Sequence, residues 1–179
     1  MDFLGVFTLA FVTALGGGTL RDVMLDRYPL FWIEHAHYPV ILFCLALVSF
    51  FVPRIPEKFK QLLNLPDAIG LGLFSIVGAQ YALEAETSWF VAAIFGVITG
   101  CFGGVISEII ANKVPTIFRS APLYATCSFF GCWVYFACLG LNAIPALAIA
   151  TGVTFIVVTR MAALYFDIRL PEQSEESGS

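Results

Sequence analysis

Two segments of the chain, "TALGGGTLRDVMLDRYPLF" at 13–31 and "TGCFGGVISEIIANKVPTI" at 99–117, repeat one another. When they are aligned, each residue falls on the one 86 positions later, as Thr13 falls on Thr99. An internal repeat of this kind predicts a fold built from two copies of one structural unit. The other matched pairs include Gly17 and Gly103, Gly18 and Gly104, Asp22 and Glu108, Pro29 and Pro115, and Tyr38 and Tyr124.

The composition places both copies in a membrane. Hydrophobic residues make up 59% of the 179 residues and charged residues only 12%, with a mean hydropathy of +0.88. Soluble domains carry about 25% charged residues, so this chain lacks the polar surface that water requires. Its hydrophobic runs are continuous rather than alternating, which favours helices over a barrel. We expect an all-α polytopic membrane protein with six spans, at about 3–25, 37–53, 66–84, 88–111, 121–140 and 144–166.

The span at 66–84 has no partner in the first copy, because its match would fall before Met1. The simplest account is a three-helix repeat in which the first helix of the first copy is absent from this sequence, with coding sequence upstream of Met1. A genuine six-helix protein is the alternative. Because three is odd, the copies would insert in opposite orientations, as inverted repeats. The expected units are 1–64 (two helices of the first repeat), 65–142 (the second repeat), 143–168 (an extra C-terminal helix) and 169–179 (a disordered acidic tail).

The basic residues predict the orientation. Seven of the nine Lys and Arg residues fall on the side of the membrane from which the first span starts, and only Arg21 and Arg27 fall on the other. Cytoplasmic loops carry an excess of Lys and Arg. We therefore expect the loop that contains Lys58 and the C-terminus to be cytoplasmic.

The repeated glycines admit two interpretations. Glycine in a helix allows close packing of neighbouring helices, and we assign Gly96 to that role. Alternatively, glycines weaken a helix, which then breaks or kinks and turns backbone groups toward a water-filled path. Matched clusters in two inverted repeats favour the second interpretation, with a site between the halves. It would use Gly16, Gly17, Gly18, Gly103 and Gly104.

Polar residues follow each glycine cluster. Arg21 and Asp22 lie one turn beyond the first cluster, and Ser107 and Glu108 occupy the matched places after the second. Charges within a span are costly and usually face a pathway or a partner. Asp67 follows a proline, so it is either a helix cap or part of the path. Thr13 and Thr99 are weaker candidates, because threonine often bonds to its own helix.

Other chemistry has less support. The five cysteines lie within predicted spans without a C-x-x-C pattern, as expected of interface residues. Glu34, His35 and His37 could hold a metal only with a further ligand pair, which the sequence does not supply. Asp22 and Asp26 could bind Mg²⁺ on a diphosphate, but a second acidic motif is missing. We expect no enzyme activity, catalytic residue, metal, cofactor or nucleic-acid partner.

At these motifs the chain resembles the bacterial members of the trimeric intracellular cation channel (TRIC) family, also labelled glycine-transporter-domain proteins. The resemblance rests on "GGGTLRD" and "YPLFW", on "LPDAIGLGLFSIVGAQ", and on "GGVISE" and "VP", and it covers about residues 1–168. It implies a seven-helix inverted-repeat protomer in a homotrimer of the bacterial inner membrane, with a separate pore for monovalent cations, chiefly potassium, in each protomer. Ser107 stands where relatives repeat the arginine, so the pore would lose one positive charge. The implied pore residues are Gly16, Gly17, Gly18, Arg21, Asp22, Gly103 and Gly104.

Two functions therefore remain open. A potassium or sodium channel is the first. A carrier for glycine or another small zwitterion is the second, because an arginine and a carboxylate would hold an amino acid's carboxylate and ammonium groups. A carrier shows no unitary currents, so single-channel recording separates the two.

Overall fold

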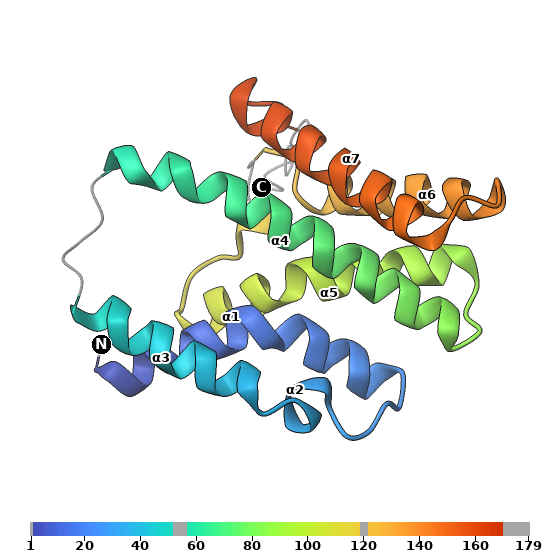
Figure 1. Ribbon diagram of the computed structural model, residues 1–179. Coiled ribbons are helices and arrows are strands. Elements are labelled where there is room, and N and C mark those ends of the chain that lie inside the picture. Colours follow the sequence, from blue (N-terminus) through green and yellow to red (C-terminus); the bar gives the residue numbers. More distant parts are fainter. Residues whose placement is uncertain (1, 52–56, 119–121, 170–179) are drawn as a thin grey trace, which may run out of the picture.

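A computed structural model describes residues 2–51, 57–118 and 122–169. Every regular element of the described chain is a helix, and turns or loops join them (Figure 1). Two of the basic residues used for the orientation, Arg54 and Arg119, lie outside the described residues, as does the predicted tail apart from Arg169. The elements are α1 (Phe3–Met24), α2 (Phe31–Glu34), α3 (His37–Phe51), α4 (Glu57–Glu84), α5 (Trp89–Ile110), the 3₁₀ helix η1 (Thr116–Phe118), α6 (Ala125–Gly140) and α7 (Pro145–Tyr165).

The six predicted spans correspond to α1, α3, α4, α5, α6 and α7. The largest difference is at α4, which begins at Glu57 and contains Pro66 in its interior. Asp67 is therefore not an N-terminal cap, and that interpretation is wrong. Proline removes one backbone hydrogen bond but does not end this helix, as is tolerated in membrane helices where neighbouring groups compensate. The short elements α2 and η1 were not predicted.

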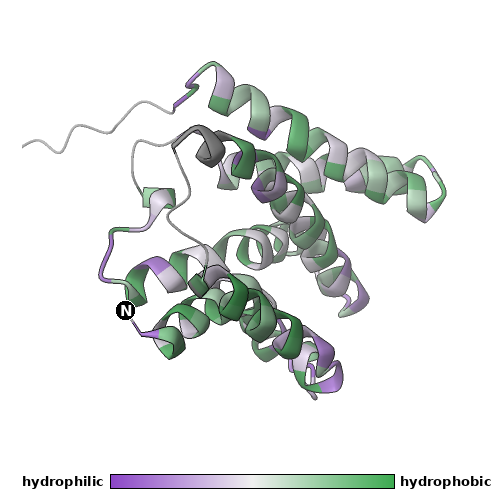
Figure 2. Ribbon diagram, turned by 60° about the vertical axis from the view of Figure 1, so that its left-hand side comes forward, coloured by the Kyte–Doolittle hydropathy of each residue, from purple (hydrophilic) through white to green (hydrophobic). Residues whose placement is uncertain are grey.

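The helices have the hydropathy of a membrane protein. Four of them, α1, α4 from Leu62, α5 and α7, are long and apolar enough to cross a bilayer, while α3 and α6 are shorter, with 15 and 16 residues. Hydrophobic residues cover most of the helix surfaces, and hydrophilic residues gather near their ends (Figure 2). Large apolar side chains such as Val40, Phe51 and Leu147 are exposed. Lipid rather than water is the solvent that suits this surface.

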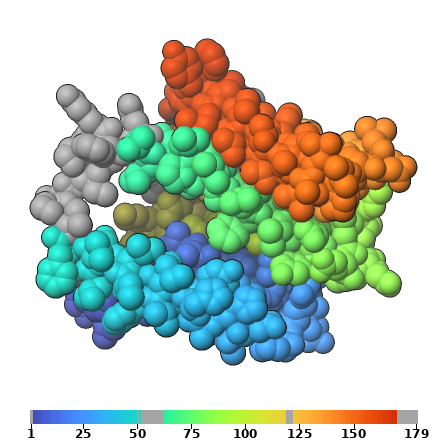
Figure 3. Space-filling model, in the orientation of Figure 1, coloured from blue at the N-terminus to red at the C-terminus, as the bar shows by residue number. Residues whose placement is uncertain are grey.

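The helices form three layers in the view of Figure 1, with α4 and α5 between the pair α1 and α3 and the pair α6 and α7. Helices α1 and α5 pack against each other and run in opposite directions, as expected of matched helices in inverted repeats. On the face drawn in Figure 3 the surface is hollowed between α3 and α4.

The ends of α1 and α5 repeat each other in detail. Asp26 and Asn112, which are matched, have positive φ angles of 53° and 55°. The next residue donates its N–H to the backbone oxygen of the matched acid, from Arg27 to Asp22 and from Lys113 to Glu108, at 2.8 Å in both cases. Asparagine and aspartate tolerate this left-handed conformation, which ends a helix. The two copies therefore share backbone geometry as well as sequence.

Small residues bring α4, α5, α6 and α7 together around the main core. Gly96 lies against the Cys132 sulfur and the Ser75 carbonyl, so a side chain there would collide with α4 and α6. The hydroxyls of Ser75 and Ser128 are hydrogen-bonded at 2.6 Å, fully buried between α4 and α6. Close approach through small residues and buried polar bonds is typical of helix packing in membranes.

Candidate functional site: two pockets related by the repeat

The glycine clusters meet where α1 crosses α5. A Cβ atom on Gly17 would collide with the Thr99 carbonyl, and one on Gly103 would collide with the Thr13 carbonyl. The two contacts are equivalent under the repeat, since Gly17 matches Gly103 and Thr13 matches Thr99. Gly16 lies at the same crossing, with its Cβ position 3.5 Å from the Gly103 Cα. These glycines let the two backbones touch.

The expected break in these helices is not found. Each is one continuous helix of 22 residues that passes through its glycines. Glycine weakens a helix by about 1 kcal/mol, and close packing against the partner offsets that cost. The hydroxyls of Thr13 and Thr99 each donate to the carbonyl four residues earlier, at 2.7 Å. At this crossing the glycines therefore serve packing.

A cavity of about 480 Å³, the first-repeat pocket, lies beside Gly18. A Cβ atom on Gly18 would be 2.6 Å from the Phe31 ring, so this glycine leaves room for α2. The charged residues of the wall are two arginines and two acids, which balance. They are Arg21, Asp22, Arg27 and Glu34, and the wall also includes Leu15, Phe31, His35, Tyr38 and Tyr81.

Arg21 and Asp22 form a buried ion pair in that wall. Their side chains are 4% and 3% exposed, and the closest nitrogen and oxygen atoms are 2.6 Å apart. The second Asp22 oxygen accepts the N–H of Phe31, the first residue of α2, at 3.1 Å. The Arg21 guanidinium lies 4.3 Å from the centre of the Tyr81 ring. Asp22 thus neutralises Arg21 and holds the loop that returns to α2.

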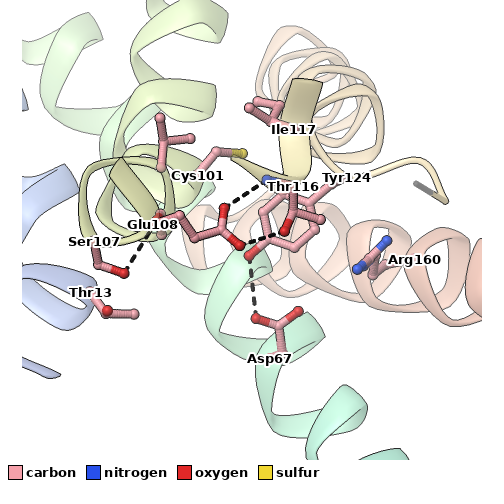
Figure 4. A pocket seen from close by; sticks show the side chains of 11 residues that line it. Thr13, Asp67, Cys101, Ser107, Glu108, Thr116, Ile117, Tyr124 and Arg160 are labelled. Atoms are coloured by element: carbon pink, nitrogen blue, oxygen red, sulfur yellow. Dashed lines mark hydrogen bonds between the residues drawn. The ribbon is translucent and has the colours of Figure 1, made fainter. Parts of the chain in front are cut away.

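A cavity of about 280 Å³, the second-repeat pocket, lies beside Gly104 (Figure 4). No atom lies within 4 Å of a Cβ built on Gly104, so this glycine faces open space. Glu108 accepts the N–H of Thr116, the first residue of η1, at 2.7 Å. Glu108 therefore holds η1 as Asp22 holds α2. The wall consists of Thr13, Asp67, Cys101, Gly104, Val105, Ser107, Glu108, Thr116, Ile117, Tyr124 and Arg160.

The two pockets are counterparts under the repeat. They share no residue, but six positions of one wall match six of the other at the offset of 86. This correspondence is hard to obtain from chance cavities, because each pair requires the same helix face to be open in both copies. The pairs are Leu15 and Cys101, Gly18 and Gly104, Arg21 and Ser107, Asp22 and Glu108, Phe31 and Ile117, and Tyr38 and Tyr124.

One charged residue of the second-repeat pocket belongs to neither copy. Arg160 comes from α7 and is 7% exposed. Sequence reasoning counted it only as a basic residue near a membrane surface. Its position within the apolar run at 144–166 was the available signal, since charges inside spans usually face a path or a partner. Figure 4 shows Arg160 beyond Tyr124 from Glu108, with Asp67 below the tyrosine hydroxyl.

All twelve candidate residues lie in these three places. Gly16, Gly17, Gly103 and Thr99 are at the crossing. Gly18, Arg21 and Asp22 line the first-repeat pocket, and Thr13, Asp67, Gly104, Ser107 and Glu108 line the second.

Within the described part of the chain, no group of three His, Cys, Asp or Glu residues could hold a metal ion, and this includes Glu34, His35 and His37.

The chain matches the family model described as "Glycine transporter" over residues 1–54 and 64–140. It is 36% identical to a UPF0126 membrane protein of Vibrio cholerae over 96% of this chain and 72% of the relative. It is 34% identical to the UPF0126 inner membrane protein YadS of Escherichia coli, over 96% of this chain and 83% of the relative. Both relatives are described as membrane proteins, in agreement with the predicted class of this chain.

Solved structures give the same family. One, from work on the structural basis for conductance through TRIC cation channels, superposes with a TM-score of 0.92 at 34% identity over 99% of this chain and 87% of that chain. A TRIC orthologue from Rhodobacter sphaeroides superposes with a TM-score of 0.79 at 29% identity over 93% and 95% of the two chains. The family resemblance seen in the sequence is thereby confirmed. This chain is a membrane protein that belongs to the glycine transporter family, which includes the bacterial trimeric intracellular cation channels.

Proposed function

We propose that this protein is a channel for monovalent cations, chiefly potassium, with a pore in each protomer of a homotrimer. The observation that carries the proposal is the pair of matched pockets on the two sides of the crossing of α1 and α5. A path through inverted repeats runs between the copies and presents equivalent residues to the two sides of the membrane. The channel names of the solved relatives support the same conclusion.

The path runs from one pocket to the other past the crossing. Thr13 lies on the wall of the second-repeat pocket, and the next residue, Ala14, lies on the wall of the first. The contact of Gly17 with Thr99 and that of Gly103 with Thr13 lie about one helical turn apart and together form the constriction. Conduction requires α1 and α5 to separate there by a small amount.

The charges of the second-repeat pocket favour cations. Its wall holds the carboxylates of Asp67 and Glu108 and a single guanidinium, from Arg160. The first-repeat pocket is balanced, because Arg21 is paired with Asp22. A ring or cluster of acidic residues is the common device by which pores select cations. The second-repeat pocket is therefore the selective half of the path.

A carrier for glycine or another small amino acid is the second candidate. One observation favours it: the second-repeat pocket places carboxylates and an arginine around one small cavity, which suits the two ends of a zwitterion. The family model bears the corresponding description. The two candidates differ in kinetics, since a channel gives unitary current steps in a planar bilayer and a carrier gives none.

The deciding experiment measures potassium flux and glycine uptake in parallel, in proteoliposomes of the purified protein. We expect potassium flux and unitary currents without saturable glycine uptake. Gly104→Leu should reduce the flux to less than about a tenth, because the new side chain enters the open space of the second-repeat pocket. Gly70→Leu is the matched control, since Gly70 also faces open space but lines neither pocket, and its flux should equal that of the parent. Glycine uptake without current would reject the channel.

The assembly and orientation complete the proposal. The protomer consists of the first-repeat unit at 1–64, the second-repeat unit at 65–142 and a further helix at 143–168. Chemical crosslinking in native membranes should give a trimer, since the Rhodobacter relative is described as trimeric. The Lys and Arg distribution supports a cytoplasmic C-terminus. The second-repeat pocket, which contains Glu108 at the C-terminal end of α5, then faces the cytoplasm.

A further inference from the structure

Arg160 is a fixed and buried positive charge. Its Nη1 atom donates to the carbonyl oxygens of Pro122 and Leu123 at 2.9 and 3.0 Å. The guanidinium lies 4.6 Å from the centre of the Tyr124 ring. Within the described residues its Nε atom has no hydrogen-bond partner, and no carboxylate forms an ion pair with it. Neutral groups hold the side chain in place, so no residue that the structure describes cancels its charge by direct contact.

The two carboxylates of the same pocket are also held by neutral groups. Asp67 accepts a hydrogen bond from the Tyr124 hydroxyl at 3.3 Å, and Glu108 accepts from Thr116. The wall therefore carries two acids and one unpaired base, with a net charge of one negative. Without Arg160 the same wall would carry two negative charges.

The position of this base is what distinguishes the two pockets. In the first copy Arg21 adjoins its acid and neutralises it, whereas Ser107 holds the matched place beside Glu108. Arg160 supplies a positive charge to the second-repeat pocket from α7, which lies outside the repeat. Arg160 makes the net charge of the pocket less negative, but it does not lie close enough to form an ion pair with Asp67 or Glu108.

We propose that Arg160 sets the preference of the channel for monovalent over divalent cations; this inference rests on the proposed channel function. Coulomb energy scales with the charge of the ion, so a fixed positive charge repels Mg²⁺ or Ca²⁺ twice as strongly as potassium at the same place. Two carboxylates with free oxygen lone pairs would otherwise suit a divalent ion, which takes carboxylate oxygens as ligands. Arg160 leaves one net negative charge, which one monovalent cation neutralises.

The test is the reversal potential of the reconstituted channel with potassium on one side and Mg²⁺ or Ca²⁺ on the other. Arg160→Gln should raise the divalent permeability relative to potassium about tenfold. Arg160→Lys keeps the charge and should retain the selectivity of the parent. The double variant Asp67→Asn with Arg160→Gln returns the net charge to one negative and should restore it. An unchanged ratio in a conducting Arg160→Gln channel overturns the inference, as does an equal shift in Arg160→Lys.

Two further measurements keep the result interpretable. If Arg160→Gln does not fold, Glu108→Gln tests the same rule from the other side, since a pocket of zero net charge should exclude divalent ions more strongly than the parent. If the parent itself conducts no potassium, the channel proposal fails separately. Calorimetric titration of the detergent-purified proteins with Ca²⁺ then decides the inference, with about tenfold tighter binding expected for Arg160→Gln. Equal Ca²⁺ affinity would refute it.

Discussion

Replacing Asp22 with asparagine should destabilise the protein substantially, although the substitution changes few atoms. The carboxylate is the ion-pair partner of Arg21 at 2.6 Å, and both side chains are almost fully buried. Removing one member of a buried pair leaves an uncompensated charge, which costs about 3–5 kcal/mol. The Tyr81 ring, 4.3 Å from the guanidinium, remains beside the charge in the variant, so the lower end of this range applies. We therefore expect a net loss of about 3 kcal/mol.

The assay is thermal unfolding in detergent. Its readout is the fraction of protein that still runs as a monodisperse peak in size-exclusion chromatography after heating. In a chain of this length, a loss of about 3 kcal/mol in the free energy of unfolding lowers the midpoint temperature of unfolding by about 6–12 °C. The double variant Arg21→Gln with Asp22→Asn removes both charges and should recover at least half of the loss. Glu84→Gln is the control, because the Arg27–Glu84 pair is exposed and worth less than about 1 kcal/mol. A midpoint for Asp22→Asn within error of Glu84→Gln would refute the assignment of Arg21 and Asp22 as a stabilising buried pair.

Three further predictions concern the crossing, the pocket charge and the orientation. Gly17→Leu and Gly103→Leu should each lower the midpoint temperature of unfolding by several degrees, because overpacking costs about 1–3 kcal/mol. The two effects should be similar, because the two contacts are equivalent. A large effect at one position alone would contradict this equivalence. Ser107→Arg should reduce potassium conductance in bilayers, since the new arginine would neutralise Glu108 as its match does in the first copy; unchanged conductance would place the selective acids elsewhere. Cysteines introduced at Lys58 and in the C-terminal tail should resist impermeant thiol reagents in intact cells. Labelling of either from outside would contradict the predicted orientation.

The sequence predicted the long helices well because each is a continuous apolar run that is bounded by charge or by turn residues. It missed α2 and η1, which are too short to show a periodic pattern. It also missed the first nine residues of α4, from Glu57 to Leu65, because polar residues followed by Pro66 are typical of a loop. The α4 helix continues through that proline, which local sequence patterns do not predict.

For the site, the repeat was the informative signal. The offset of 86 predicted the residues of the crossing and part of each pocket wall, such as Gly18 and Asp22 in one and Gly104 and Glu108 in the other. It could not distinguish glycines that pack, such as Gly103, from those that border open space, such as Gly104, because the two are adjacent in sequence and differ only in the face of the helix they occupy. It also could not find Arg160, which lies on a helix outside the repeat and has no matched residue.

The reciprocal contacts between α1 and α5 also have an evolutionary consequence. A surface in which Gly17 meets Thr99 while Gly103 meets Thr13 is self-complementary, as in a two-fold symmetric dimer. A single unfused copy that inserted in both orientations would make the same contacts with a second molecule of itself. In such an ancestor every mutation acts twice, and the two pockets must remain identical. Fusion of the copies into one gene removes that constraint, so that one copy can retain arginine at position 21 while the other carries serine at position 107.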